Sequence, residues 1–124
     1  MCIAQIMRFA KEHSALDKPL FFDYECSDEW YSIQTFIAKK DIGFHWTQKH
    51  LIDGIEAYIE GEHKEAVLTT VRSLYDYLRR KDQQFLDFYI TYCPDDDYYG
   101  CSCIVTENDL VVRADGIHIT MSDM

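Results

Sequence analysis

The sequence predicts an α+β fold with about four helices followed by a C-terminal three-stranded antiparallel β-meander. Over much of residues 1–92 the apolar residues recur at steps of three and four, as they do on one face of a helix. After Gly100 they alternate instead, which is typical of strands. The chain has 124 residues, of which 48% are hydrophobic and 15% aromatic, so residues 1–124 are expected to form one domain around one core. We see no internal repeat and no linker.

The first predicted helix ends near His13, and its apolar stripe consists of Ile3, Ile6, Met7 and Ala10. The next segment, residues 17–26, fits two structures. Asp17 followed by Pro19 suits the start of a short helix. The alternation of its aromatic residues favours extended structure, which we prefer for Phe22, Tyr24 and Cys26.

A second helix is predicted to begin at Ser27, because Asp28 and Glu29 place negative charge in its first turn. Its apolar face consists of Trp30, Ile33, Phe36 and Ile37. A third helix is predicted between Thr47, as its cap, and Gly61, where it stops. Its stripe consists of Leu51, Ile55, Tyr58 and Ile59.

A fourth helix is predicted from about Glu62, with its inward stripe at Val67, Leu68, Val71, Leu74, Tyr75 and Leu78. It is expected to break near Lys81 and to continue until Pro94 through Phe85, Phe88, Tyr89 and Tyr92. Three strands then follow, joined by the turn-like sequences TEND and ADG. Their core-facing residues are Cys101, Cys103 and Val105, then Leu110, Val112 and Ala114, and finally Ile117, Ile119 and Met121.

The charge of the chain restricts the classes of partner. Twelve Lys and Arg residues against 22 Asp and Glu residues make a net charge of −10, which disfavours direct binding of nucleic acid or an anionic membrane and favours basic proteins. Residues 81–124 hold two basic and nine acidic residues. From Asp82 to Val112 there is no Lys, Arg or His, although an ordinary surface mixes charges of both signs.

Carboxylates and tyrosines alternate in this window, which predicts a surface that contacts cations on another protein. The predicted contact residues are Asp87, Tyr92, Asp95, Asp96, Asp97, Tyr98, Tyr99, Glu107 and Asp109. The function we expect is that of a stoichiometric inhibitor of a nuclease toxin or another nucleic-acid-binding protein, like an immunity protein or antitoxin, without enzymatic activity. An alternative is an anti-restriction or anti-defence protein that mimics DNA.

A second alternative is a small metal-binding regulatory domain that uses the C-terminal cysteines. Cys93, Cys101 and Cys103, with His118 as a fourth ligand, are residue types that bind structural zinc. Their spacing is not that of a CxxC knuckle, and the strand pattern places His118 on the opposite face. We therefore predict no metal ligand and no cofactor, and we interpret the cysteines as packing residues.

Other function classes and the compartment rest on weaker signals. A small hydrolase or transferase built on His45 or His50 stays open, because sequence spacing does not show which residues meet in space. The N-terminal segment lacks the order of regions typical of a signal peptide. No run approaches the roughly 18 apolar residues that a membrane span needs. Together with five cysteines, an odd number, this predicts a cytoplasmic protein. No oligomeric state is predicted.

Overall fold

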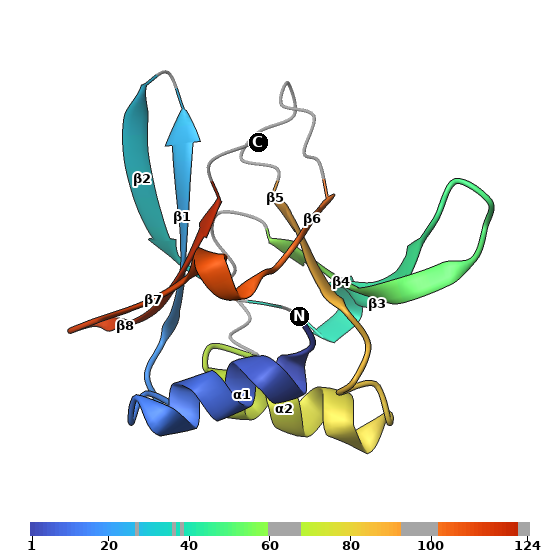
Figure 1. Ribbon diagram of the computed structural model, residues 1–124, viewed down its shortest axis with the longest axis horizontal. Helices are drawn as coiled ribbons and strands as arrows, with labels where there is room; N and C mark the ends of the chain where they lie inside the picture. The colour runs from blue at the N-terminus through green and yellow to red at the C-terminus, as the bar shows by residue number, and fades with distance from the viewer. Residues whose placement is uncertain (27, 36, 38, 60–67, 93–101, 122–124) are drawn as a thin grey trace.

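A computed structural model describes residues 1–26, 28–35, 37, 39–59, 68–92 and 102–121. Within these ranges, two α-helices pack against each other below two four-stranded sheets (Figure 1). The helices are α1 (Ile3–Glu12) and α2 (Val71–Arg80), with short 3-10 helices η1 (Lys39–Asp41) and η2 (Glu107–Asp109). The strands are β1 (Leu20–Cys26), β2 (Glu29–Gln34), β3 (Ile42–Trp46), β4 (Ile52–Ile59), β5 (Phe88–Tyr92), β6 (Ser102–Ile104), β7 (Leu110–Arg113) and β8 (Gly116–Met121).

Both sheets are mixed and have the same plan. Sheet 1 has the strand order β2-β1-β8-β7, and sheet 2 has the order β3-β4-β5-β6. In each sheet the central pair, β1 with β8 or β4 with β5, is parallel, and the outer pairs are antiparallel. The core lies between the inner faces of the sheets and the helices, and Phe22 and Phe88 are among its largest buried side chains.

The two halves of the chain repeat one arrangement of a helix, two strands, a 3-10 turn and two strands. Equivalent elements of the two halves begin 68 positions apart in the chain. This holds for α1 and α2, for β1 and β5, and for η1 and η2. Each half contributes one strand pair to each sheet, so the halves exchange strands. The backbone contacts repeat too, since Leu20 N–H donates to Thr69 O and Phe88 N–H donates to Met1 O, both at 2.9 Å.

The expectation that the chain has no internal repeat was therefore wrong at the level of structure. The repeat is not visible in the sequence, because equivalent residues of the two halves share their polarity but are different amino acids. Ala10 in α1 corresponds to Leu78 in α2, for example, and both are buried. A packed core constrains side-chain volume and polarity more strongly than residue identity.

The two helices form where apolar periodicity and end signals agree. In α2, Ser73 N–H donates to Thr70 Oγ1 at 3.1 Å, a side-chain cap of the first turn. Ser14 and Asp82 follow the two helices with φ of 53° and 57°, the left-handed conformation common after a helix C-terminus. The first predicted helix and the central part of the fourth are confirmed, with their buried faces at Ile3, Ile6, Ala10, Val71, Leu74 and Leu78.

The prediction of about four helices was wrong, because residues 29–34, 52–59 and 88–92 form strands. The predicted third helix relied on a spacing of four residues between Ile55 and Ile59. Residues four apart share a face on a strand as well as on a helix, so this spacing does not distinguish the two structures. In β4, Ile55 and Ala57 are both buried, which shows period two.

The predicted C-terminal meander was also wrong, although all three strands exist. β7 and β8 pair antiparallel as expected, whereas β6 pairs with β5 in the other sheet. This partner was not foreseen, because residues 85–92 were assigned to a helix. The preference for extended structure in residues 17–26 is confirmed by β1. Within the described ranges, neither helix has the length and apolar character needed to cross a membrane.

Candidate functional site

The outer face of sheet 1, which points away from the core, carries a polar cluster beside a pocket of about 540 Å³. Residues on β1 and β8 alternate between the two faces of the sheet, so Phe22 and Ile119 enter the core while Asp23 and His118 lie on the outer face. β2 and the β7–β8 hairpin complete the pocket. Its lining residues are Asp23, Trp30, Tyr31, Ser32, Arg113, Asp115, His118 and Thr120.

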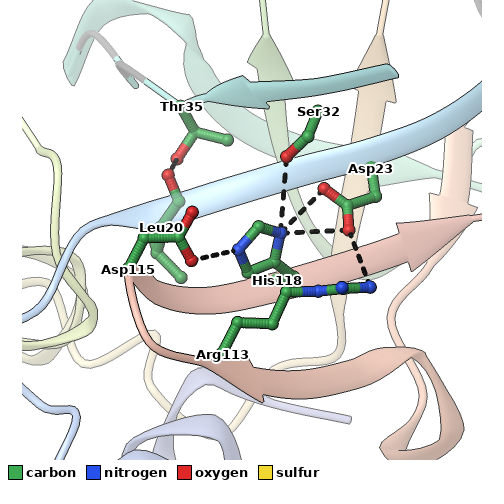
Figure 2. Close-up of polar contacts among 7 residues, drawn as sticks. All are labelled: Leu20, Asp23, Ser32, Thr35, Arg113, Asp115 and His118. Carbon is green, nitrogen blue, oxygen red and sulfur yellow. Dashed lines mark hydrogen bonds and ion pairs between the residues drawn. The ribbon is translucent and has the colours of Figure 1, made fainter. Parts of the chain in front are cut away.

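His118 is the centre of this cluster (Figure 2). Its Nδ1 lies 2.8 and 3.0 Å from the two carboxylate oxygens of Asp23, and its Nε2 lies 2.7 Å from Asp115 Oδ1. Both ring nitrogens of His118 thus contact carboxylate oxygens. His118 is 3% exposed and Asp23 6% exposed, so this ion pair is buried.

Arg113 balances the charge of the cluster, with a guanidinium nitrogen 3.8 Å from Asp23 Oδ2. The imidazole of His118 and the guanidinium of Arg113 thus both contact the carboxylate of Asp23. The ring of Phe21 stacks on the imidazole of His118 with centroids 4.6 Å apart. Packing and pairing together hold β1, β8 and the β7–β8 turn in one rigid surface.

Ser32, His118 and Asp23 are the residue types of a catalytic triad, but their geometry differs from one. Ser32 Oγ lies 3.4 Å from Nδ1, the nitrogen that Asp23 also occupies, and Asp115 occupies Nε2. In a triad the serine and the carboxylate contact opposite nitrogens, and the nitrogen beside the serine accepts its proton. Both nitrogens of His118 already contact carboxylates, so the arrangement differs from that of a triad.

Sheet 2 carries a counterpart of this cluster with different chemistry. Strand register relates five positions of the two sheets. Phe21 corresponds to Tyr89, Asp23 to Thr91, Arg113 to His45, Asp115 to Asp53 and His118 to Glu56. Thr91 Oγ1 donates to Glu56 Oε1 at 2.5 Å, where sheet 1 has the ion pair. Asp53 accepts from His45 at 2.5 Å and from Tyr89 at 3.1 Å. The repeat thus keeps a polar cluster on each outer face.

The hydrolase alternative gains one feature from this second cluster. His45 is hydrogen-bonded to a carboxylate, which is how a catalytic histidine is often oriented. However, the side chains of His45 and Asp53 are 20% and 34% exposed, and the His45 ring stacks on Tyr89 with centroids 3.8 Å apart. The pair therefore lies at the sheet surface rather than in a deep pocket. His50 is exposed in the β3–β4 turn, with φ of 61°.

These hydrogen bonds predict an acid-sensitive contribution to stability. The hydrogen bond from His118 lowers the pKa of Asp115, and the hydrogen bond from His45 lowers the pKa of Asp53. A carboxyl whose folded pKa lies below its unfolded value, about 3.9 for Asp, stabilises the fold above that value and loses this effect as pH falls through the folded pKa. Stability is thus expected to fall below about pH 4.

Urea unfolding at several pH values between 7 and 3 measures this effect. The double variant Asp53→Asn with Asp115→Asn is expected to show a shallower decline below about pH 4 than the wild type. The slope is the readout, because the variant can also be less stable at every pH. An equal slope in both proteins contradicts the prediction.

Four of the nine predicted contact residues lie in the described ranges. Asp87 precedes β5, and its carboxylate lies 3.4 Å from the amino group of Met1. Asp109 accepts from the Thr106 N–H at 2.8 Å, and Glu107 shares η2 with it. Tyr92 ends β5. The other five predicted residues lie outside the described ranges: Asp95, Asp96, Asp97, Tyr98 and Tyr99.

The cysteine hypothesis loses its proposed fourth ligand. Cys103 is on β6 in sheet 2, whereas His118 is on β8 in sheet 1 and both its nitrogens contact carboxylates. Cys93 and Cys101 lie outside the described ranges. Among the residues that the structure describes, no group of three or more His, Cys, Asp or Glu is arranged to hold a metal ion.

Sequence reasoning missed the cluster on sheet 1, although a signal was present. From Pro19 to Ala38 there is no Lys, Arg or His, as in the window after Asp82. This stretch also interleaves rings and carboxylates, at Asp23, Tyr24, Glu25, Asp28, Glu29, Trp30 and Tyr31. The two windows fall at equivalent places in the repeat, since residues 27–28 connect β1 to β2 and residues 93–101 connect β5 to β6.

No family model, curated protein or solved structure matches this chain.

Proposed function

We propose that this protein binds a basic protein and inhibits it stoichiometrically, the target being a nuclease toxin or another nucleic-acid-binding protein. The β1–β2 hairpin carries the proposal. Trp30 is 54% exposed and Tyr31 42% exposed, and the carboxylates of Glu25, Asp28 and Glu29 on the same hairpin are exposed too. This hairpin lies within the stretch that has no positive residue.

The contacts within the hairpin suit recognition of Arg and Lys side chains. Tyr31 OH donates to Glu29 Oε2 at 2.8 Å, and Glu25 lies across the strand pair from Trp30. A guanidinium or ammonium group binds well where a carboxylate and an aromatic face lie close together. Buried Trp and Tyr often dominate the binding energy of interfaces, and unbalanced charge accelerates association.

The cluster below the hairpin supports this role by holding the surface in place. Its carboxylates contact His118 and Arg113, whereas Glu25, Asp28 and Glu29 are exposed on the hairpin above it. A binding surface held rigid before contact loses less entropy on association. A second contact with the partner, through the acidic residues between β5 and β6, stays a prediction.

Removing the charge of the hairpin is expected to weaken capture of the partner roughly tenfold or more. The test variant combines Glu25→Gln, Asp28→Asn and Glu29→Gln. The matched control combines Glu12→Gln, Asp76→Asn and Asp82→Asn, which removes the same charge from exposed positions in and after the helices. Both proteins and the wild type are immobilised at low ionic strength and exposed to a lysate of the organism that encodes the chain.

Wild type and control are expected to retain one basic protein in stoichiometric amount, and rising salt should release it. The enzymatic activity of that protein should then fall to zero at one equivalent of inhibitor. Equal capture by the hairpin variant and the control contradicts the role of the hairpin. Capture without loss of activity contradicts inhibition.

A further inference from the structure

The pocket on the outer face of sheet 1 has the size of a small-molecule site. Its volume is about 540 Å³, within the range of roughly 300 to 1,000 Å³ that is typical of ligand pockets. Asp23 and His118 are buried at its base. Three other lining residues are more than half exposed, at 54% for Trp30, 57% for Arg113 and 56% for Asp115. These three side chains are therefore accessible to a ligand.

Arg113 offers hydrogen-bond donors to the pocket (Figure 2). One of its guanidinium nitrogens lies 3.8 Å from Asp23 Oδ2, which is beyond hydrogen-bond distance. Among the described residues, the side chain of Arg113 donates no hydrogen bond. A guanidinium has five N–H donors in a planar fork that matches the two oxygens of a carboxylate. Arg113 can therefore bind the carboxylate of a ligand without losing a hydrogen bond.

Asp115 places the opposite charge at the same pocket, two residues further along the β7–β8 hairpin. Its Oδ1 lies 2.7 Å from His118 Nε2, and this hydrogen bond lowers the pKa of the carboxyl. The group is thus ionised at neutral pH. An ionised carboxylate accepts several hydrogen bonds, so Asp115 can bind an ammonium group while it keeps its contact with His118.

Trp30 supplies an apolar wall beside these two charges. Residues alternate between the two faces of a strand, so Trp30 lies on the same side of β2 as Ser32, which pairs with Asp23 of β1. That side is the outer face of sheet 1, where the pocket lies. An exposed indole ring packs well against an apolar or aromatic group. The pocket thus combines an exposed cation, an exposed carboxylate and an exposed ring.

This combination of opposite charges selects the class of ligand. A ligand with only a positive charge would be repelled by Arg113, and one with only a negative charge would be repelled by Asp23 and Asp115. We propose that the pocket binds a free α-amino acid with an apolar side chain. Its carboxylate binds Arg113, its ammonium group binds Asp115, and its side chain packs on Trp30. This small-molecule site goes beyond the proposed inhibition and does not rest on it.

The fluorescence of Trp30 in the full chain tests binding directly. The chain has two tryptophans, and the other one, Trp46, is exposed on β3 in sheet 2, so Trp46→Phe leaves Trp30 as the reporter. The probe is L-phenylalanine, which does not absorb where tryptophan is excited. A saturable change in emission is expected, with half-saturation below about 5 mM. Emission that shows no saturable change up to about 20 mM overturns the proposal.

Two analogues of the probe test which group of the ligand meets which residue. Phenethylamine lacks the carboxylate and 3-phenylpropanoate lacks the ammonium group, so each should bind the reporter protein at least about threefold more weakly than L-phenylalanine. Arg113→Gln should weaken binding of L-phenylalanine by a similar factor without weakening that of phenethylamine. Asp115→Asn should weaken binding of L-phenylalanine without weakening that of 3-phenylpropanoate.

Arg79→Gln and Asp76→Asn are the matched controls, because they remove the same charges from exposed positions on α2. Both should bind L-phenylalanine like the reporter protein. Analogues that bind as tightly as L-phenylalanine contradict recognition of both charges. A pocket variant that weakens L-phenylalanine and its insensitive analogue equally contradicts the assigned contacts. All titrations use the purified chain alone, so their outcome is independent of the capture experiment.

Discussion

Replacing Gly116 with alanine is expected to lower the free energy of unfolding by more than about 3 kcal/mol. A Cβ at this position would lie 2.1 Å from the backbone oxygen of Pro19, and the φ of Gly116 is +157°. The next residue, Ile117, donates its N–H to the same oxygen at 3.1 Å. Relieving the clash would separate β8 from β1 where their parallel pairing begins.

The repeat supplies a second site and the sequence supplies a control. Gly54 is the counterpart of Gly116, and a Cβ there would lie 2.4 Å from the backbone oxygen of Asp87, so Gly54→Ala should be similarly costly. Gly43 has nothing within 4 Å of an added Cβ. Gly43→Ala is expected to change stability by less than about 0.5 kcal/mol. Denaturant unfolding measures all three, and equal losses at Gly116 and Gly43 would contradict the close approach of the strands.

Replacing His118 with glutamate is expected to cost more than about 3 kcal/mol of unfolding free energy. The substitution replaces the imidazole between Asp23 and Asp115 with a third carboxylate. At the equivalent place in sheet 2, Glu56 is satisfied by a hydrogen bond from Thr91. Adding Asp23→Thr to His118→Glu transfers that pair to sheet 1, and is expected to recover at least about half of the loss.

A double-mutant cycle, with each variant unfolded in urea, measures this recovery. His45→Ala, at the position equivalent to Arg113, removes the imidazole that contacts a carboxylate in sheet 2. Because its pair with Asp53 is partly exposed, we expect a smaller loss than for His118→Glu. Additive losses from Asp23→Thr and His118→Glu would show that the two clusters are not interchangeable, and would contradict the equivalence of the two outer faces.

The sequence allowed prediction of the elements whose local signals agree. α1 and α2 combine apolar periodicity with good ends, and β7 and β8 alternate on both sides of a turn. β2, β4 and β5 were assigned to helices, because their apolar spacings fit both periods. Only pairing with a neighbouring strand distinguishes a strand from a helix in these segments. That pairing can be predicted only once the partner segment is known to be a strand.

The candidate site was predictable to a similar extent. Reading charge along the chain identified the acidic window after Asp82, and the same reading identifies the stretch from Pro19 to Ala38. No sequence spacing predicts that Asp23 and His118 form a buried pair, because the two positions are 95 residues apart. They meet because β1 and β8 come from different halves of the chain and lie side by side in one sheet.

Composition and local pattern by themselves determined that this is an acidic chain, that residues 3–12 and 71–80 are amphipathic helices, and that carboxylates are interleaved with rings in windows without positive charge. The tertiary structure alone decided that the chain is a strand-exchanged repeat, which sheet each strand joins and which charges are buried together. The physical reason is range. Helix periodicity and charge act over a few residues, whereas strand partners and buried ion pairs depend on contacts between segments far apart in the chain.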